Sequence, residues 1–348
     1  MTGLVYDDIF LDHGEPHHPE RRERLEVALA RLDADGLRAA MQPLPVRPAT
    51  LEELQWLHDR DYVLHVQALS AAGGGDIDLD TIATAGTWAA ACAAAGACID
   101  AVRAVHERAA DNALCLVRPP GHHARLGTGM GFCFFNNAGL AAEALIRDGA
   151  QRVAIVDFDG HHGNGTQEAF YHRGDVLYIS LHQAPLFPGT GFPEEVGVEE
   201  GFGGTINLPF APQAQDIHYL RAFDEIVLPA LAGYHPEAIV VSAGYDGHFR
   251  DPIAQLLLTA RGFFLMTVGL LTAARDLCDG RLTMVLEGGY DLQVGLPESI
   301  EATACALMRQ PERAWTPLDR EPHAQMTARV EEGLEQVIAQ HRQSPLLS

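Results

Sequence analysis

The sequence predicts an α/β fold in which a mostly parallel sheet is covered by helices on both faces. Short runs rich in Val, Ile and Leu alternate along the chain with longer amphipathic segments. The runs are nearly continuous in apolarity, as strands covered on both faces should be. The longer segments have helical length, and this alternation is typical of βαβ units.

Six apolar runs are predicted to be strands. They are short and rich in aliphatic and β-branched residues, which is typical of buried strands. Helical patterns lie between several of them, and this favours parallel pairing. The runs are 113–117, 153–159, 176–182, 205–210, 238–244 and 282–288.

Four segments have the period and length of helices. The first begins near Pro19, which suits a first helical turn, and the second ends at Gly149. No repeat, low-complexity linker or break in composition divides the chain, so residues 1–348 are expected to form a single catalytic domain. The segments are 18–32, 136–149, 217–234 and 260–280.

Composition limits the classes of partner. The chain has 348 residues, 47% of them hydrophobic, which is enough for a large core. Its formal net charge is −23, from 24 basic and 47 acidic residues. This balance argues against a nucleic-acid partner, which needs a basic surface. An acidic rim would instead attract a cationic substrate.

Cysteine usage and the amino-terminal segment predict a cytoplasmic protein. The six cysteines include no CxxC pair and are expected to be reduced core residues. The first 15 residues are acidic and lack the pattern of a signal peptide. The Ala-rich segment 85–99 is judged too short and too weakly apolar to span a membrane. The oligomeric state stays open, a homo-oligomer included.

Polar and ionisable residues follow five of the predicted strands. They occur in RPPGHH after residue 117, in DFDGHHGNG after 156, and in SLH, SAGYD and EGGY after three later strands. Ligands of such sheets bind at the carboxyl ends of the strands. We therefore expect one functional site at this edge of the sheet.

The stretch RVAIVDFDGHHGNG (152–165) predicts a metal site. Asp157, Asp159 and His161 follow a buried run, where ionisable groups cost several kcal/mol unless they are paired or bind an ion. Alternation along an extended chain would direct these three side chains to one side. Asp246, after the strand at 238–244, can supply a third ligand beside Asp159 and His161. Two carboxylates and one imidazole suit a single catalytic Zn²⁺ with an open position, although Fe²⁺ or Co²⁺ also fits.

Two further motifs carry groups for proton transfer and for oxyanion stabilisation. His122 and His123 follow a rigid Pro-Pro-Gly turn, and two imidazoles beside a metal-activated water can divide general acid and base roles. Tyr290 follows tandem glycines in EGGYDL, and a neutral phenol can donate a hydrogen bond to an oxyanion. No GxGxxG, P-loop or GxSxG pattern occurs, so neither a nucleotide cradle nor a serine nucleophile is predicted.

Together these motifs resemble the zinc-dependent histone deacetylase family, in particular its bacterial, class II-like amidohydrolases. The resemblance implies the arginase/deacetylase fold, with a central, mostly parallel sheet of about eight strands. It covers nearly the whole chain through HHPERRERL (17–25), RPPGHHA (118–124), GFCFFNNA (131–138), VDFDGHHGNGTQ (156–167), YISLH (178–182), SAGYD (242–246) and EGGYDL (287–292).

The resemblance also implies residue roles. Asp159, His161 and Asp246 match the zinc ligands, His122 and His123 the tandem catalytic histidines, and Tyr290 the transition-state tyrosine. Asp157 and Asn164 match the groups that hydrogen-bond the histidines. Asp157, Asp159, His161, Ser180 and Leu181 match a structural K⁺ site. Gly131, Phe132, Phe187, Ile253 and Asp80 match the substrate tunnel and its rim.

The function predicted from these residues is metal-dependent hydrolysis of an acylated amine. The substrate is expected to be acyl-lysine or a small molecule, and its amine to be cationic. Three alternatives stay open: a hydrolase of acetylpolyamines or other small amides or esters, a catalytically silent protein that binds acyl-lysine, and an arginase-like two-metal hydrolase.

Overall fold

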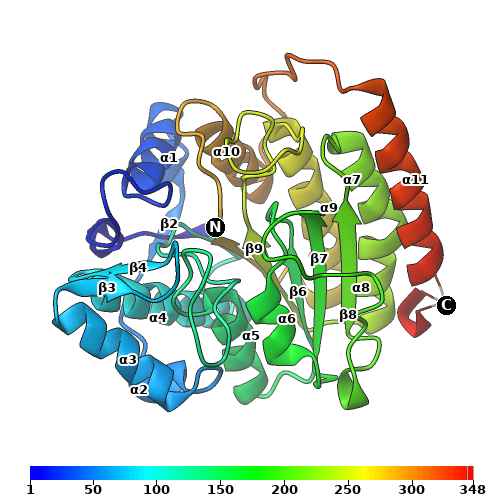
Figure 1. The fold of residues 1–348 in the computed structure, drawn as a ribbon. Coiled ribbons are helices and arrows are strands. Elements are labelled where there is room, and N and C mark those ends of the chain that lie inside the picture. Colours follow the sequence, from blue (N-terminus) through cyan, green and yellow to red (C-terminus); the bar gives the residue numbers. More distant parts are fainter. Residues whose placement is uncertain (343, 348) are drawn as a thin grey trace.

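Eight parallel strands form one sheet in the computed structural model of the chain, in the order β2-β1-β5-β10-β9-β6-β7-β8 (Figure 1). The structure describes residues 1–342 and 344–347. The central strands are buried along their whole length, which explains their continuous apolarity. The strands are β1 (Thr2–Val5), β2 (Gln42–Leu44), β5 (Asn112–Cys115), β6 (Val153–Asp157), β7 (Val176–Gln183), β8 (Thr205–Phe210), β9 (Ala238–Ala243) and β10 (Leu282–Leu286).

All six predicted strands are present, with corrected ends. The structure ends β5 at Cys115, β6 at Asp157 and β10 at Leu286, each two residues before the predicted end, because the chain leaves the sheet there and enters a loop. Sequence analysis did not find β1 and β2. Strand β1, TGLV, contains a polar residue and a glycine and so gives no continuous apolar run, and β2, QPL, is a three-residue edge strand that contains proline.

Helices cover both faces of the sheet (Figure 1). Helices α4, α5 and α6 pack on one face, whereas α1, α9 and α10 pack on the other, and α11 lies along the edge strand β8. The α-helices are α1 (Glu23–Ala34), α2 (Leu51–Leu54), α3 (Arg60–Ala71), α4 (Thr87–His106), α5 (Asn137–Arg147), α6 (Asn164–Phe170), α7 (Asp216–Ala222), α8 (Leu228–Tyr234), α9 (Ala260–Cys278), α10 (Gly295–Leu307) and α11 (Ala324–His341).

Two helix predictions were wrong in detail. The predicted helix 18–32 begins only at Glu23, because His18 Nδ1 accepts the Glu20 N–H at 3.0 Å and turns the chain before the helix. The predicted helix 217–234 is divided into α7 and α8 by a π-helical turn, η4 (Phe223–Val227). Pro229 follows this turn, and a proline cannot continue regular i to i−4 bonding.

Helix α4 corrects the expectation for the Ala-rich segment. Its 20 residues extend beyond 85–99, and a window of 18 residues has a mean hydropathy of 1.4. Within the described ranges, α4 is the one helix long and apolar enough to cross a membrane. However, 72% of that window is buried inside the protein, as in a core helix. All six cysteines are free and buried, two of them in α4, as expected for packing residues.

A small antiparallel hairpin stands beside the main sheet, at the left of Figure 1 next to α3. Its strands are β3 (Gly74–Asp76) and β4 (Ile82–Thr84). The turn between them carries Asp80, whose carbonyl accepts a hydrogen bond from His18 Nε2 at 3.1 Å. The hairpin thereby brings an acidic side chain to the carboxyl edge of the sheet.

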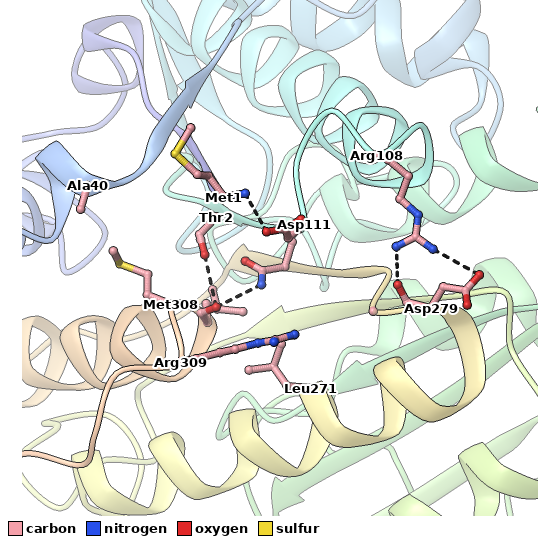
Figure 2. A pocket seen from close by; sticks show the side chains of 12 residues that line it. Met1, Thr2, Ala40, Arg108, Asp111, Leu271, Asp279, Met308 and Arg309 are labelled. Carbon is pink, nitrogen blue, oxygen red and sulfur yellow. Dashed lines mark hydrogen bonds and ion pairs between the residues drawn. The ribbon is translucent and has the colours of Figure 1, made fainter.

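A hollow of about 470 Å³ lies at the opposite edge, where β1 and β5 begin (Figure 2). Its charged groups largely pair with one another: the Met1 ammonium lies 2.7 Å from Asp111, and Arg108 lies 3.2 Å from Asp279. The ionisable residues that the sequence singles out lie at the other edge, around a smaller cavity. Size therefore does not identify the functional site in this fold, whereas side-chain chemistry does.

Helix α4 packs so closely that replacing one of its glycines by alanine is expected to lower the stability of the protein, whereas such a replacement inside a helix usually raises it. A Cβ at Gly96 would lie 2.3 Å from the Arg47 carbonyl oxygen, so Gly96→Ala is expected to destabilise the protein by about 1–3 kcal/mol. Gly333→Ala in α11 meets no atom within 4 Å and should stabilise it by up to about 1 kcal/mol. Denaturant unfolding of both variants checks the pair, and a gain in stability for Gly96→Ala would contradict this packing.

Candidate active site

Four adjacent strands at the centre of the sheet position the candidate site. The loop after β5 carries His122 and His123, the loop after β6 carries Asp159 and His161, and β9 and β10 are followed by Asp246 and Tyr290. In the sheet these strands lie in the order β5-β10-β9-β6. Because they are parallel, their carboxyl ends meet at one edge. His122 and Tyr290, which are 168 positions apart in sequence, therefore share one cavity.

The three predicted metal ligands converge. His161 Nδ1 lies 2.7 Å from Asp246 Oδ2 and 3.2 Å from Asp159 Oδ1. One ligand atom from each residue lies within 4.8 Å of the others, and all three residues are buried. Alternation along a strand is not the cause, because β6 ends at Asp157. Instead, Asp157 accepts the Asp159 N–H and Asp159 accepts the His161 N–H, which folds the loop into successive side-chain-bonded turns.

The donor set fits a divalent cation. Asp159 Oδ2 accepts the Gly288 N–H at 2.8 Å and Asp246 Oδ1 accepts the Gly160 N–H at 2.6 Å, which fixes both carboxylates. A Cβ at Gly288 would lie 2.6 Å from Asp159 Oδ2 and 2.7 Å from Asp246 Oδ2, so the close approach requires glycine. Two ionised carboxylates carry two negative charges, whereas one imidazole carries at most one positive charge. A bound cation would compensate for the remaining negative charge.

The two neighbouring histidines face the same point. Ala124 N–H donates to the Gly121 carbonyl at 2.9 Å and closes a turn around them, and their ring centroids lie 4.1 Å apart. The first amides of α6 donate to the His122 carbonyl, at 3.0 Å from Gly165 and 3.2 Å from Thr166. Adjacent side chains of an extended segment point apart, whereas this turn lets both imidazoles reach the same cavity.

Hydrogen bonds fix which nitrogen of each histidine faces the cavity. His122 Nδ1 donates to Asp157 Oδ2 at 3.0 Å, and His123 Nδ1 donates to Asn164 Oδ1 at 2.8 Å. The amide oxygen of Asn164 only accepts, so the proton of neutral His123 lies on Nδ1. Its Nε2 lone pair is then available in the cavity, as a general base requires.

The two histidines have opposite pKa shifts. Burial alone would lower the pKa of His122, but the negative charges of Asp157 and Asp159 outweigh it and raise that pKa to about 10. Burial, together with the positive charges of His122 and His161, holds the pKa of His123 well below its usual range. One imidazole is therefore cationic and its neighbour neutral near pH 7.

Tyr290 closes the cavity from the β10 side. Its ring packs edge-on against Phe132, with centroids 5.7 Å apart, and the Arg24 guanidinium lies 4.9 Å from the ring centre on a face. Burial raises the pKa of Tyr290 well above its ordinary value. The hydroxyl therefore stays protonated and can act as a hydrogen-bond donor.

These groups line one cavity of about 150 Å³. All five residues predicted for the tunnel and its rim border it, with Phe187 39% exposed at the mouth. Asp246, Asp157 and Asn164 lie behind the lining and hold it in place. The lining residues are Asp80, Pro120, His122, His123, Gly131, Phe132, Cys133, Asp159, His161, Phe187, Ile253, Gly288 and Tyr290.

Glu287 is a site residue that sequence analysis missed. It is fully buried; one carboxylate oxygen accepts the N–H groups of Gly121 and His122 at 2.7 and 3.1 Å, and the other accepts the Ser242 hydroxyl at 3.1 Å. Burial raises its pKa to about 7. Glu287, His122 and Cys133 also form a close group of potential metal ligands. Because both Glu287 oxygens already accept hydrogen bonds, we assign it the role of holding the histidine turn.

Two other contacts were also missed. The Tyr178 hydroxyl lies 3.1 Å from both Asp157 Oδ2 and the Gly163 carbonyl, so it connects that carboxylate with the loop after β6. The His18 ring packs on Phe132 at 4.6 Å and bonds the Asp80 carbonyl, which ties the rim to the tunnel wall. An ionisable residue at the end of an apolar run could have indicated Glu287, whereas these two contacts have no local sequence signal.

The K⁺ site implied by the resemblance stays a prediction. Asp157 of β6 pairs with Ser180 of β7 in the parallel register, and Leu181 follows it. The Ser180 hydroxyl bonds His182 Nδ1 at 2.9 Å. Asp157, Ser180 and Leu181 thus lie on two neighbouring strands, and Asp159 and His161 follow in the loop after β6.

Comparison with known proteins decides the family. The histone deacetylase domain family matches residues 18–307. The chain belongs to the histone deacetylase family. A probable deacetylase of Archaeoglobus fulgidus is 43% identical over 300 residues, which cover 85% of this chain and 83% of the relative. A histone deacetylase-like amidohydrolase of Pseudomonas aeruginosa is 43% identical over 279 residues, covering 80% and 73%.

The fold agrees with this assignment. A solved structure of the HDA15 HD domain superimposes with a TM-score of 0.90 at 34% identity, covering 99% of this deacetylase chain and 96% of that one. The predicted arginase/deacetylase α/β fold is therefore confirmed. The chain is an amidohydrolase of a family that is generally metal-dependent, and its buried ligand group agrees with that chemistry.

The ligand geometry predicts a metal-binding defect. Asp246→Asn removes one of two carboxylates and should weaken binding of the cation by at least about 100-fold, since changes outside the ligand set alone cost 10–100-fold. Elemental analysis after dialysis measures metal per chain. Asp279→Asn, which alters an exposed ion pair near the opposite edge, should keep the full complement. Equal metal content in both variants would contradict the assigned ligands.

Proposed function

We propose that the protein hydrolyses the amide bond of an acylated primary amine such as acetyl-lysine. One observation carries this proposal: Asp159, His161, His122, His123 and Tyr290 line a single cavity of about 150 Å³. This combination provides a cation site, a base, an acid and an oxyanion donor around one point, as amide hydrolysis requires.

The proposed cofactor is one Zn²⁺ per chain, held by Asp159, His161 and Asp246, although Fe²⁺ or Co²⁺ also suits these ligands. When bound, the cation supplies Lewis-acid chemistry: it polarises the acyl carbonyl and increases the acidity of water. The support is the buried ligand set, which carries excess negative charge, and the family membership. A structural K⁺ beside Asp157 and Ser180 is proposed from the resemblance.

His123 and His122 divide the proton transfers in this proposal. Neutral His123 accepts a proton from water at Nε2 as the water oxygen forms its bond to the acyl carbon. Cationic His122, held by Asp157, favours the negative charge that develops in the cavity. When the carbon–nitrogen bond breaks, an imidazolium gives its proton to the departing amine, and the amine leaves with an acid as second product.

Tyr290 stabilises the oxyanion. Tyr290 lines the cavity and its hydroxyl stays protonated, so it donates a hydrogen bond to the carbonyl oxygen as charge develops there. Asn164 and Asp157 keep the histidines oriented, and Glu287 holds the turn that presents them. Little movement is needed during the reaction, because these groups are already placed.

The tunnel favours an apolar stem and a cationic amine. Phe132, Phe187 and Gly131 form walls that suit a methylene chain, and Asp80 places a carboxylate at the mouth. Ile253 is apolar at the rim, which favours acyl-lysine over a small polycation. The net charge of −23 attracts either amine, so charge alone does not separate the two substrates.

A substrate panel on metal-reconstituted protein tests the proposal. An acetyl-lysine peptide should be turned over faster than N-acetylputrescine, and acyl groups of increasing length report the depth of the tunnel. Faster turnover of N-acetylputrescine or of a small ester would favour the polyamine or esterase alternative. Stoichiometric metal without turnover of any substrate would indicate a silent acyl-lysine-binding protein. His123→Ala is the inactive control.

Tyr290→Phe tests the oxyanion role. Loss of this donor should lower kcat by about 10²–10³-fold and leave KM within about threefold, because the hydrogen bond strengthens only in the transition state. Steady-state kinetics on the preferred substrate measures both constants. The control is Tyr234→Phe, which removes a hydroxyl that donates to the Gly174 carbonyl outside the cavity lining. This variant should change neither kcat nor KM. A raised KM at unchanged kcat would assign Tyr290 to ground-state binding instead.

A further inference from the structure

The segment that carries Tyr290 lies outside the helices and strands. It connects the end of β10 at Leu286 with the start of α10 at Gly295. Backbone bonds hold it on either side of the tyrosine: the Gly288 carbonyl accepts the Tyr245 N–H and the Asp291 carbonyl accepts the Leu296 N–H, each at 3.0 Å. Side chains from elsewhere hold the residues between these two points. Arg24 Nε donates to the Gly289 carbonyl at 2.7 Å, which holds the preceding residue.

Asp251 holds the tyrosine itself. One oxygen of its carboxylate, Oδ2, accepts the N–H of Tyr290 at 2.6 Å and the N–H of Asp291 at 3.2 Å. The other oxygen, Oδ1, accepts the N–H of Ile253 at 2.9 Å. Asp251 is only 8% exposed, and no Lys, Arg or His side chain of residues 1–342 or 344–347 forms an ion pair with it.

Burial and the negative charge of Asp246 raise the pKa of Asp251 to about 8, and its three backbone N–H donors oppose this rise. The bonds of this carboxyl group join two parts of the cavity. Tyr290 and Ile253 both line that cavity, whereas Asp251 does not. One side chain thus connects the proposed oxyanion donor with the rim of the tunnel. Both neighbours of this carboxylate along the chain, Arg250 and Pro252, lie outside the lining as well.

We propose that Asp251 is a positioning residue, whose carboxylate fixes the Tyr290 hydroxyl at the reacting carbonyl and holds Ile253 at the rim, so that the tyrosine and the rim form one unit. The inference rests on the proposed function for its catalytic consequence. It does not require Asp251 to touch substrate or metal.

The substitution Asp251→Asn separates this role from simple space filling. Asparagine has nearly the same shape, but it offers one acceptor oxygen and one donor NH₂. Whichever way the amide turns, an N–H group of Tyr290 or of Ile253 faces another donor. A displacement of about 1 Å at a reacting group can cost about 10²-fold in rate. We expect kcat to fall about 10–100-fold, with KM within about threefold.

A double-mutant cycle tests whether Asp251 acts through Tyr290. In the Tyr290→Phe background the hydroxyl is absent, so Asp251→Asn should lower kcat by less than about threefold. A loss as large as in the wild-type background would overturn the proposal. The matched control is Asp216→Asn: its carboxylate accepts the Thr259 N–H at 2.9 Å at the start of α9, outside the cavity lining. It should leave kcat unchanged.

Amide hydrogen exchange tests the anchoring without any turnover. Peptides covering 288–292 and 252–254 should exchange at least about tenfold faster in Asp251→Asn than in wild type, and at the wild-type rate in Asp216→Asn. Unchanged exchange in Asp251→Asn would overturn the proposal even if the protein is an active deacetylase. Faster exchange in a protein that hydrolyses no acyl substrate would support the anchoring and refute only the proposed function.

Discussion

The structure depends on burying four carboxylates away from solvent at one edge of the sheet. Asp157, Asp159, Asp246 and Glu287 are each at most 1% exposed, at the carboxyl ends of three adjacent strands. Burying such charges costs several kcal/mol each unless they are compensated. Compensation comes from imidazoles, from backbone N–H groups and, in the proposed holoenzyme, from a cation. The loops around the cavity have the shapes that these contacts require.

The central part of the fold could be predicted because burial on both faces leaves a continuous apolar run. This explains why β6, β7, β9 and β10 were found, and why β1 and β2, which are short and lie toward the sheet edge, were not. The divided helix around η4 was missed because its apolar pattern continues through the π-helical turn. Periodicity reports which face is buried, and it does not report the hydrogen-bond pattern beneath.

The site could be predicted to a similar extent and for a similar reason. The proposed ligand and catalytic residues follow strands directly, so their types and positions are visible in sequence. The residues that hold them were missed: Glu287 bonds a turn 165 positions away, and the His18 contact with Asp80 spans 62 positions. Such partners are set by the order of strands in the sheet, which propensity and local pattern do not determine.

These supporting contacts share one design, in which a carboxylate from one loop accepts backbone amides of another. Asp159 after β6 holds Gly288 after β10, Asp246 after β9 holds Gly160 after β6, and Glu287 after β10 holds the histidine turn after β5. The loops after β5, β6 and β10 are thereby each held by the loop of a neighbouring strand, in addition to bonds within the loop such as those of Asp157 and Asp159. Charge-assisted bonds of this kind are stronger than neutral ones and keep donors in place before substrate arrives. The carboxylates that make the site costly to bury are therefore also the groups that hold it rigid.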